Sequence, residues 1–201
     1  RVLFRSAPVL THIRRRDNVA PPTHEQVDAA VTDPVRLRAV RALGWLDTPP
    51  DAELDRLTAV AARLTRAPVV FLSMVDAHRD FYKAACGFGE PLASRRQLEG
   101  RTFCHYALLS DGPLVLEDVA ARDVFRDVPT VQTLGVRAYA GVPLVLPTGE
   151  VVGSFCAVDF SPRRWTHDDI MVLTEMAHSV MRAIELQALQ KQAAARAVAV
   201  Y

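Results

Sequence analysis

The fold is decided by residues 136–160, which read VRAYAGVPLVLPTGEVVGSFCAVDF. Two apolar runs, 136–146 and 151–160, flank a short segment that contains Pro147 and Gly149. Apolar runs of this length separated by turn-forming residues are typical of a β-hairpin. We therefore expect two antiparallel strands here, and the rest of the chain must supply the elements that cover their faces.

Upstream of this hairpin, the sequence predicts two helices. Asp33 and Pro34 are suited to begin a helix that runs to residue 43, and Gly44 is suited to end it. A second helix is expected over 51–66, because apolar residues recur there at helical spacing.

Between these helices and the hairpin, shorter elements are expected. The apolar runs 69–75, 80–86 and 114–117 predict strands, and a helix over 103–109 begins after Thr102. The segment 87–100 reads as a long polar loop, and 118–134 as irregular or short-helical chain. With the hairpin, these elements define an α+β protein built on an antiparallel sheet.

A long last helix follows the hairpin, with Thr166 and two aspartates at its start. Its apolar positions are spaced by three or four residues: Ile170, Leu173, Ala177, Val180 and Ile184. This is the spacing of a stripe along which two helices pair, so we expect the stripe to form a dimer contact.

A chain of 201 residues is long enough for one well-buried domain and short for two. Residues 1–32 lack a sustained period and contain Pro21 and Pro22, so we expect an extension or linker. The domain is expected over 33–186, and 187–201 continue the last helix.

Composition excludes several classes of protein. Half of the residues are hydrophobic, 23% are charged and the net charge is +1, with arginines interspersed among acids, which argues against a nucleic-acid partner. No apolar stretch has the length of a membrane span, and no signal peptide opens the chain, so we expect a cytoplasmic protein without a membrane partner. Three widely spaced cysteines predict free thiols, with neither a disulfide framework nor a metal site.

At several places the chain resembles the GAF domain family, and the resemblance covers about residues 33–186. The matching segments are Leu46 to Pro50, the strand 69–75 with Asp76, residues 103–108, Asp118 after the strand that begins at Leu114, residues 137–144 and residues 153–159. The resemblance implies a central sheet with a small-molecule pocket on one face, roofed by the middle helix and irregular segment, and dimerising helices on the other. It also implies a sensory role upstream of a histidine kinase, diguanylate cyclase or phosphatase, none of which is recognisable in these 201 residues.

The candidate ligand-binding residues are polar or aromatic side chains expected near that pocket: Phe103, Cys104, His105, Asp118, Phe125, Arg137 and Tyr139. For the aromatic residues, core packing is the alternative. For Asp118 and Arg137, a mutual hydrogen bond that fixes a loop is an equal alternative.

Cofactor and enzymatic functions are weighed against this sensor hypothesis. Cys104 and His105 are adjacent on a helix and point about 100° apart, so they do not meet as nucleophile and base. Bilin-binding members of the family carry a Cys-His pair closer to the hairpin than Cys104 and His105 are here, which argues against a bilin. His105 is the only histidine expected in the interior of the domain, and a single histidine is weak evidence for haem. Cyclic-nucleotide-binding members of the family carry an Asn-Lys pair. The only asparagine here is Asn18, outside the expected domain, so a cyclic nucleotide is not expected as the ligand.

Thiol chemistry supplies the enzymatic alternative, which is the GAF-fold reductase of free methionine sulfoxide. Cys86 and Cys104 lie near places where that subfamily has cysteines, but 120–134 contains none. We therefore expect a non-enzymatic domain, in which a ligand, or oxidation at Cys86 or Cys104, shifts a population of states and the terminal helices relay the change to a dimer partner. A dimerisation scaffold without ligand is the remaining alternative.

Overall fold

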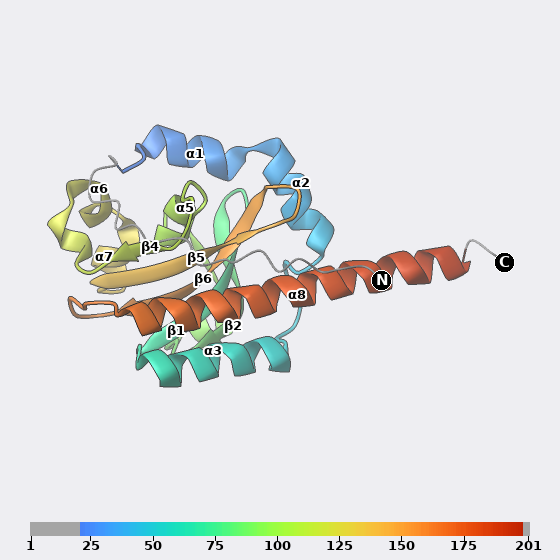
Figure 1. The fold of residues 1–201 in the computed structure, drawn as a ribbon. Coiled ribbons are helices and arrows are strands. Elements are labelled where there is room, and N and C mark those ends of the chain that lie inside the picture. Colours follow the sequence, from blue (N-terminus) through green and yellow to red (C-terminus); the bar gives the residue numbers. More distant parts are fainter. Residues whose placement is uncertain (1–20, 199–201) are drawn as a thin grey trace.

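The computed structural model describes residues 21–198. The elements in chain order are α1 (His24–Thr32), α2 (Pro34–Leu43), α3 (Ala52–Thr65), β1 (Val69–Val75), β2 (Arg79–Cys86), α4 (Leu92–Arg95), β3 (Gln97–Glu99), α5 (Phe103–Ala107), β4 (Leu114–Leu116), the 3-10 turn η1 (Val119–Ala121), α6 (Asp123–Arg126), α7 (Pro129–Thr133), β5 (Ala138–Val145), β6 (Val151–Asp159) and α8 (His167–Val198). Figure 1 shows a central sheet between two helical layers.

The sheet has six strands in the order β3-β2-β1-β6-β5-β4, and each of its neighbouring pairs is antiparallel. The predicted hairpin is present: β5 and β6 pair from Ala138 opposite Asp159 to Val145 opposite Val151. Gly149 holds a positive φ of 101° in its turn, a conformation that favours glycine. The α+β class and the antiparallel sheet predicted from the sequence are thereby confirmed.

One face of the sheet is covered by α3 and α8, which lie side by side beneath it in Figure 1. The strands present small residues to α8, namely Ala138 and Ala140 from β5 and Ala157 from β6, all of which are fully buried. The five apolar positions of α8 that were expected to form a dimer stripe belong to this same core, with Ile184 only 4% exposed. That expectation needs correction, because the protomer itself buries the stripe.

The opposite face is covered by α1 and by the short helices α5, α6 and α7 (Figure 1). Thr23 and Gln26 form a capping box at the start of α1, and Val27 and Val31 pack into the second core. The sequence analysis expected an extension or linker up to residue 32, and this part of it is instead a docked helix. Residues 1–20 lie outside the described residues.

The segment 46–50, the first of the segments that resemble the GAF family, is held against the sheet by hydrogen bonds from two basic side chains. Lys83 Nζ on β2 donates to Thr48 Oγ1 at 2.7 Å and to the carbonyl oxygen of Pro49 at 2.9 Å. Arg96 donates to the carbonyl oxygen of Thr48 at 2.9 Å. Helix α2 has already ended at Gly44, Pro49 and Pro50 disfavour helical structure in this segment, and the two basic side chains fix the path of the chain between α2 and α3.

The segment 87–100, which was expected to be a polar loop, contains regular structure. It holds the short helix α4 and the edge strand β3, which pairs with β2.

Helix α8 continues without a break to Val198 and reaches well beyond the sheet in Figure 1. Within residues 21–198, no helix combines the length and apolar character that a membrane crossing requires.

Candidate functional site

A pocket of about 200 Å³ lies between the sheet and the layer that contains α5 and α7. Strands β1, β2, β5 and β6 contribute residues from one face of the sheet to it, because successive side chains of a strand point to opposite faces. On β1, for example, Val69 and Phe71 line the pocket, whereas Val70 and Leu72 lie in the core beneath α3 and α8. The remaining lining comes from residues 87–92, the start of α5, the 130–136 segment and Phe160 just after β6.

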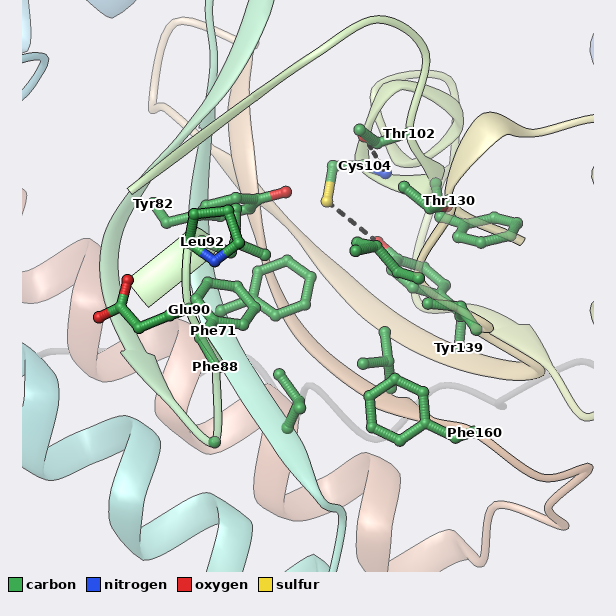
Figure 2. Close-up of a pocket in the computed structure, with 18 residues that line it drawn as sticks. Phe71, Tyr82, Phe88, Glu90, Leu92, Thr102, Cys104, Thr130, Tyr139 and Phe160 are labelled. Carbon is green, nitrogen blue, oxygen red and sulfur yellow. Dashed lines mark hydrogen bonds between the residues drawn. The ribbon is translucent and has the colours of Figure 1, made fainter. Parts of the chain in front are cut away.

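Two groups of aromatic rings form opposite walls of the pocket (Figure 2). In the first, Phe71, Tyr82 and Phe88 contact one another with ring centroids 4.8–5.4 Å apart. In the second, the ring of Phe103 lies against that of Tyr139 with centroids 5.3 Å apart. These separations are typical of aromatic contacts, so each wall is a packed unit.

Two glycines give the pocket its shape. A Cβ at Gly141 would lie 2.1 Å from the hydroxyl oxygen of Tyr139, so only glycine lets that ring lie along β5. Gly87 has a φ of 92°, and a Cβ there would lie 2.0 Å from the carbonyl oxygen of Pro68. The loop that carries Phe88 therefore leaves β2 in close contact with the start of β1.

A chain of sulfur and hydroxyl contacts closes the inner end of the pocket. Cys104 Sγ lies 3.8 Å from Cys156 Sγ, and the Tyr139 hydroxyl lies 3.1 Å from Cys156 Sγ and 3.9 Å from Cys104 Sγ. The Cys156 thiol donates to Ser154 Oγ at 3.0 Å. Burial raises the pKa of the Cys104 thiol, and its contact with Cys156 adds to the shift. Cys104 is therefore held as a protonated thiol, which is a poor nucleophile.

His105 does not line the pocket, although it is adjacent to Cys104. Its Nε2 lies 3.3 Å from Oδ1 of the fully buried Asp80, without the alignment of a hydrogen bond. Oδ2 of Asp80 accepts from the Thr102 hydroxyl at 2.5 Å. Thr102 also caps α5 by accepting from Cys104 N–H, so this cluster fixes the start of the helix.

Asp118 and Arg137 form an ion pair at 3.0 Å and lie outside the pocket lining. Asp118 also caps η1 by accepting from Ala120 N–H. The two residues therefore fix the chain between β4 and β5, which is the alternative that the sequence analysis left open. Their side chains are more than 30% exposed, so the pair is a weak contributor to stability.

Phe125 and Cys86 also lie away from the pocket. The ring of Phe125 packs on Tyr106 with centroids 5.2 Å apart, and its distance from Phe103 is 6.3 Å, so it supports the second wall from behind. Cys86 pairs with Val70 at the end of β2 and therefore faces the α3 side of the sheet. The two predicted redox cysteines are thus on opposite faces.

Of the seven predicted ligand-binding residues, the structure brings Phe103, Cys104 and Tyr139 together. Sequence reasoning missed five prominent lining residues: Phe71, Tyr82, Phe88, Thr130 and Phe160. Strand alternation carried a signal for Phe71 and Tyr82, because alternate residues of a strand face the same side of a sheet. On β1, for example, Val69 and Phe71 both face the pocket. Phe88 lies in a loop, Thr130 in the five-residue helix α7 and Phe160 just past the end of β6, and none of these segments is long enough for a periodic pattern to indicate a direction.

Comparison with known proteins identifies the family. The family profile of the GAF domain matches residues 49–184, which is more than half of the chain. The chain therefore belongs to the GAF domain family. Among the residues that the structure describes, no three His, Cys, Asp or Glu side chains are grouped so as to hold a metal ion.

Solved structures share this fold at low sequence identity. The GAF domain of PixJ from Thermosynechococcus elongatus, in its blue-light absorbing form, is 19% identical, with a TM-score of 0.59 over 82% of this chain and 96% of that one. The free methionine-R-sulfoxide reductase of Neisseria meningitidis, solved with its substrate, is also 19% identical, with a TM-score of 0.53 over 83% and 93% of the two chains. These likenesses show the fold alone.

A curated relative is closer in sequence. A cyclic di-GMP phosphodiesterase of Pseudomonas aeruginosa is 32% identical over 147 residues, which is 72% of this chain. The alignment covers 24% of that protein, so the chain spans about a quarter of its length. With the family match, this relative supports the assignment of the chain as a GAF domain of the signalling kind.

Proposed function

We propose that this chain is a regulatory sensor domain that binds a small molecule in the pocket and acts without catalysing a reaction. The observation that carries the proposal is the aromatic pocket itself, because its lining joins loop and helix segments on one side to β5 and β6 on the other. A ligand that contacts both sides stabilises one arrangement of them over others.

Strands β5 and β6 supply the path from the pocket to α8. Tyr139 and Val158 line the pocket, while their neighbours Ala140 and Ala157 are buried beneath α8 on the opposite face. Small side chains bring the helix backbone close to the sheet, so a shift of these strands moves the surface on which α8 rests. This packing supports a relay from ligand to helix.

The output proposed for this relay is a homodimer contact through the helices near both termini of the domain. The buried stripe of α8 is not available for it, but Leu186 and Leu189 are 57% and 63% exposed on the part of α8 beyond the sheet. The two leucines are three residues apart and so share one side of the helix, where they supply an apolar surface for the proposed contact. A histidine kinase, diguanylate cyclase or phosphatase output and a cytoplasmic location belong to the same proposal.

The rival function is thiol chemistry, either as a redox sensor or as a reductase of free methionine sulfoxide. The 3.8 Å separation of the Cys104 and Cys156 sulfur atoms favours this function, because two thiols this close could react with each other. The raised pKa of Cys104 and the placement of Cys86 on the other face speak against it. We expect no turnover of free methionine sulfoxide with a reductant, and turnover abolished by Cys104→Ser would favour the rival.

A native mass spectrum of gently purified protein tests the sensor function. We expect a discrete additional mass that is released on denaturation. Leu134 lies 40% exposed in the lining, so Leu134→Trp narrows the pocket without disturbing a core and should reduce the bound fraction. Leu109→Trp is the matched control, because Leu109 is 42% exposed and does not line the pocket. Equal occupancy in both variants would contradict binding in this pocket.

A further inference from the structure

Aromatic rings make up much of the pocket lining. They come from three strands, two connecting segments and helix α5, and they lie on more than one side of the space (Figure 2). The residues are Phe71, Tyr82, Phe88, Phe103, Tyr139 and Phe160. The face of an aromatic ring carries partial negative charge and attracts a cation that lies within about 6 Å of its centroid. A pocket lined by rings in this way is therefore suited to a cation.

The formal charge of the lining has the same sign. Among the described residues of the lining, none is Lys, Arg or His, and Glu90 is the one acid. Glu90 is exposed at the rim, on the side of Phe71 and Phe88 (Figure 2), and its carboxylate accepts from Ser94 Oγ at 2.6 Å and from Ser94 N–H at 3.3 Å. It therefore acts on a ligand through its field at the entrance, with no contact in the interior.

A second acid lies behind the inner part of the pocket. Asp80 is fully buried and accepts at 2.5 Å from the hydroxyl of Thr102, which is a lining residue. Burial raises the pKa of the Tyr82 hydroxyl, and the charge of Asp80 raises it further, so the field of this carboxylate reaches the pocket wall. His105 faces Asp80 from α5 and offsets part of the field when it is protonated. Phosphate and carboxylate ligands find no counter-charge in such a pocket.

The interior also restricts the kind of cation. A primary ammonium group brings N–H donors that need acceptors, but the hydroxyl of Thr102 is committed to Asp80 and that of Tyr139 to the sulfur cluster. A quaternary ammonium group has no N–H to satisfy, and its methyl groups pack against rings. A cavity of about 150 Å³ holds benzene. This pocket measures about 200 Å³, so a trimethylammonium head with a short tail fits it.

We propose that the pocket takes a small organic cation whose methylated, quaternary ammonium head is held among the aromatic rings. This inference rests on the proposed sensor function and names the chemical class of its ligand. Cyclic nucleotides, dinucleotides and carboxylate metabolites are outside that class.

Calorimetric titration with three probes of similar shape tests the charge, on protein whose native mass spectrum shows it free of ligand. Choline is the cation, 3,3-dimethylbutan-1-ol has carbon in place of the charged nitrogen, and 3,3-dimethylbutanoate is the anion. We expect one saturable choline site and at least about fivefold weaker binding of the neutral alcohol, as the loss of a desolvated cation–π contact predicts. The anion should not bind.

The variant Phe88→Leu removes one ring from a half-buried loop position and keeps an apolar side chain there. It should weaken choline binding about three- to tenfold, because one cation–π contact is lost. Binding of the neutral alcohol should stay within about twofold of its value in the unmodified protein. The alcohol therefore reports whether the pocket of the variant is intact.

The variant Glu90→Gln removes the rim charge and keeps an acceptor for Ser94. It should weaken choline binding about two- to threefold, and this difference should shrink as the salt concentration rises. Glu99→Gln is the matched control, because Glu99 is exposed at the end of β3 and lies outside the lining. It should bind choline as the unmodified protein does.

Each contrary result overturns a defined part of the proposal. Equal or tighter binding of the alcohol, or saturable binding of the anion, would overturn the cationic class. An equal loss of choline and alcohol binding in Phe88→Leu would show that the ring acts by shape alone, and equal affinity of Glu90→Gln and Glu99→Gln would remove the role of the rim charge. Absence of choline binding at millimolar concentration would reject quaternary ammonium ligands.

The sensor function is judged separately, by the copurified mass and its loss in Leu134→Trp. A copurified mass in a protein that does not bind choline would reject this ligand class and leave the sensor function standing.

Discussion

The ring of Tyr139 occupies the space that a side chain at Gly141 would need, since a Cβ there would lie 2.1 Å from the Tyr139 hydroxyl oxygen. Gly141→Ala must therefore push Tyr139 off its place beside Phe103. Overpacking of this kind costs about 1–3 kcal/mol, and chemical denaturation should show the loss. Gly112→Ala is the control, because nothing lies within 4 Å of a Cβ there. Equal stability of the two variants would mean that Tyr139 lies elsewhere.

Thiol accessibility should separate the three cysteines. Cys86 is partly exposed, whereas Cys104 and Cys156 are buried. Alkylation by iodoacetamide under native conditions, followed residue by residue with mass spectrometry, should modify Cys86 first and the other two only when the fold opens. Rapid native modification of Cys104 would reopen the redox hypothesis.

Stability should fall in alkaline solution. The pKa of Cys104 is raised in the folded protein, so above pH about 8.5 the unfolded thiol loses its proton while the folded one keeps it. The unfolded state then binds fewer protons, and the free energy of unfolding decreases as the pH rises. Urea denaturation at pH 7.5 and 9.5 should show a smaller decrease for Cys104→Ala than for Cys86→Ala. The same decrease in both variants would contradict the burial of the Cys104 thiol.

Lys83 should matter through its contacts with Thr48 and Pro49. Lys83→Met keeps the apolar stem and removes the ammonium group, so we expect a loss of about 1–3 kcal/mol in the free energy of unfolding. Arg63→Met, on the exposed side of α3, should change it by less than about 0.5 kcal/mol. A neutral effect of both substitutions would show that the segment 46–50 holds its path without these bonds.

The two halves of α8 should respond differently to substitution. Ile184→Ala removes a buried side chain and should lower stability by about 2–5 kcal/mol. Leu189→Glu changes an exposed position and should weaken self-association, measured by sedimentation, while leaving stability within about 0.5 kcal/mol. A monomeric unmodified protein at tens of micromolar would refute the dimer relay.

Local sequence rules predicted most of the sheet and its long helices. The hairpin over 136–160 follows from two apolar runs around a glycine turn, and α2 begins and ends at its predicted cap residues. Apolar spacing also predicted that one face of α8 is buried, but spacing alone does not say what covers it. The sheet of the same chain covers that face, and the dimer interpretation of the stripe was wrong for this reason. Helix α1 was missed because its apolar side is only two valines.

The candidate site was predictable in part. Cys104 and His105 were expected to point apart, and the structure places one at the pocket and the other beside Asp80. Sequence gave no means of deciding which of the two faces the pocket, because α5 has five residues and all of them are buried. Thr130 carried no signal at all, since its position depends on how 118–134 folds over the sheet.

The continuation of α8 past the sheet makes this helix a lever. Its fulcrum is the buried contact with β5 and β6, and Val198 lies about 20 Å beyond Ile184 at the rise of an α-helix. When α8 tilts by an angle too small to disturb the packing beneath Leu173, the displacement of its free end grows in proportion to the distance from the sheet. In the proposed relay, the domain therefore keeps a rigid core around its pocket while the distal end of α8 moves by a larger distance at the site where a partner would contact it.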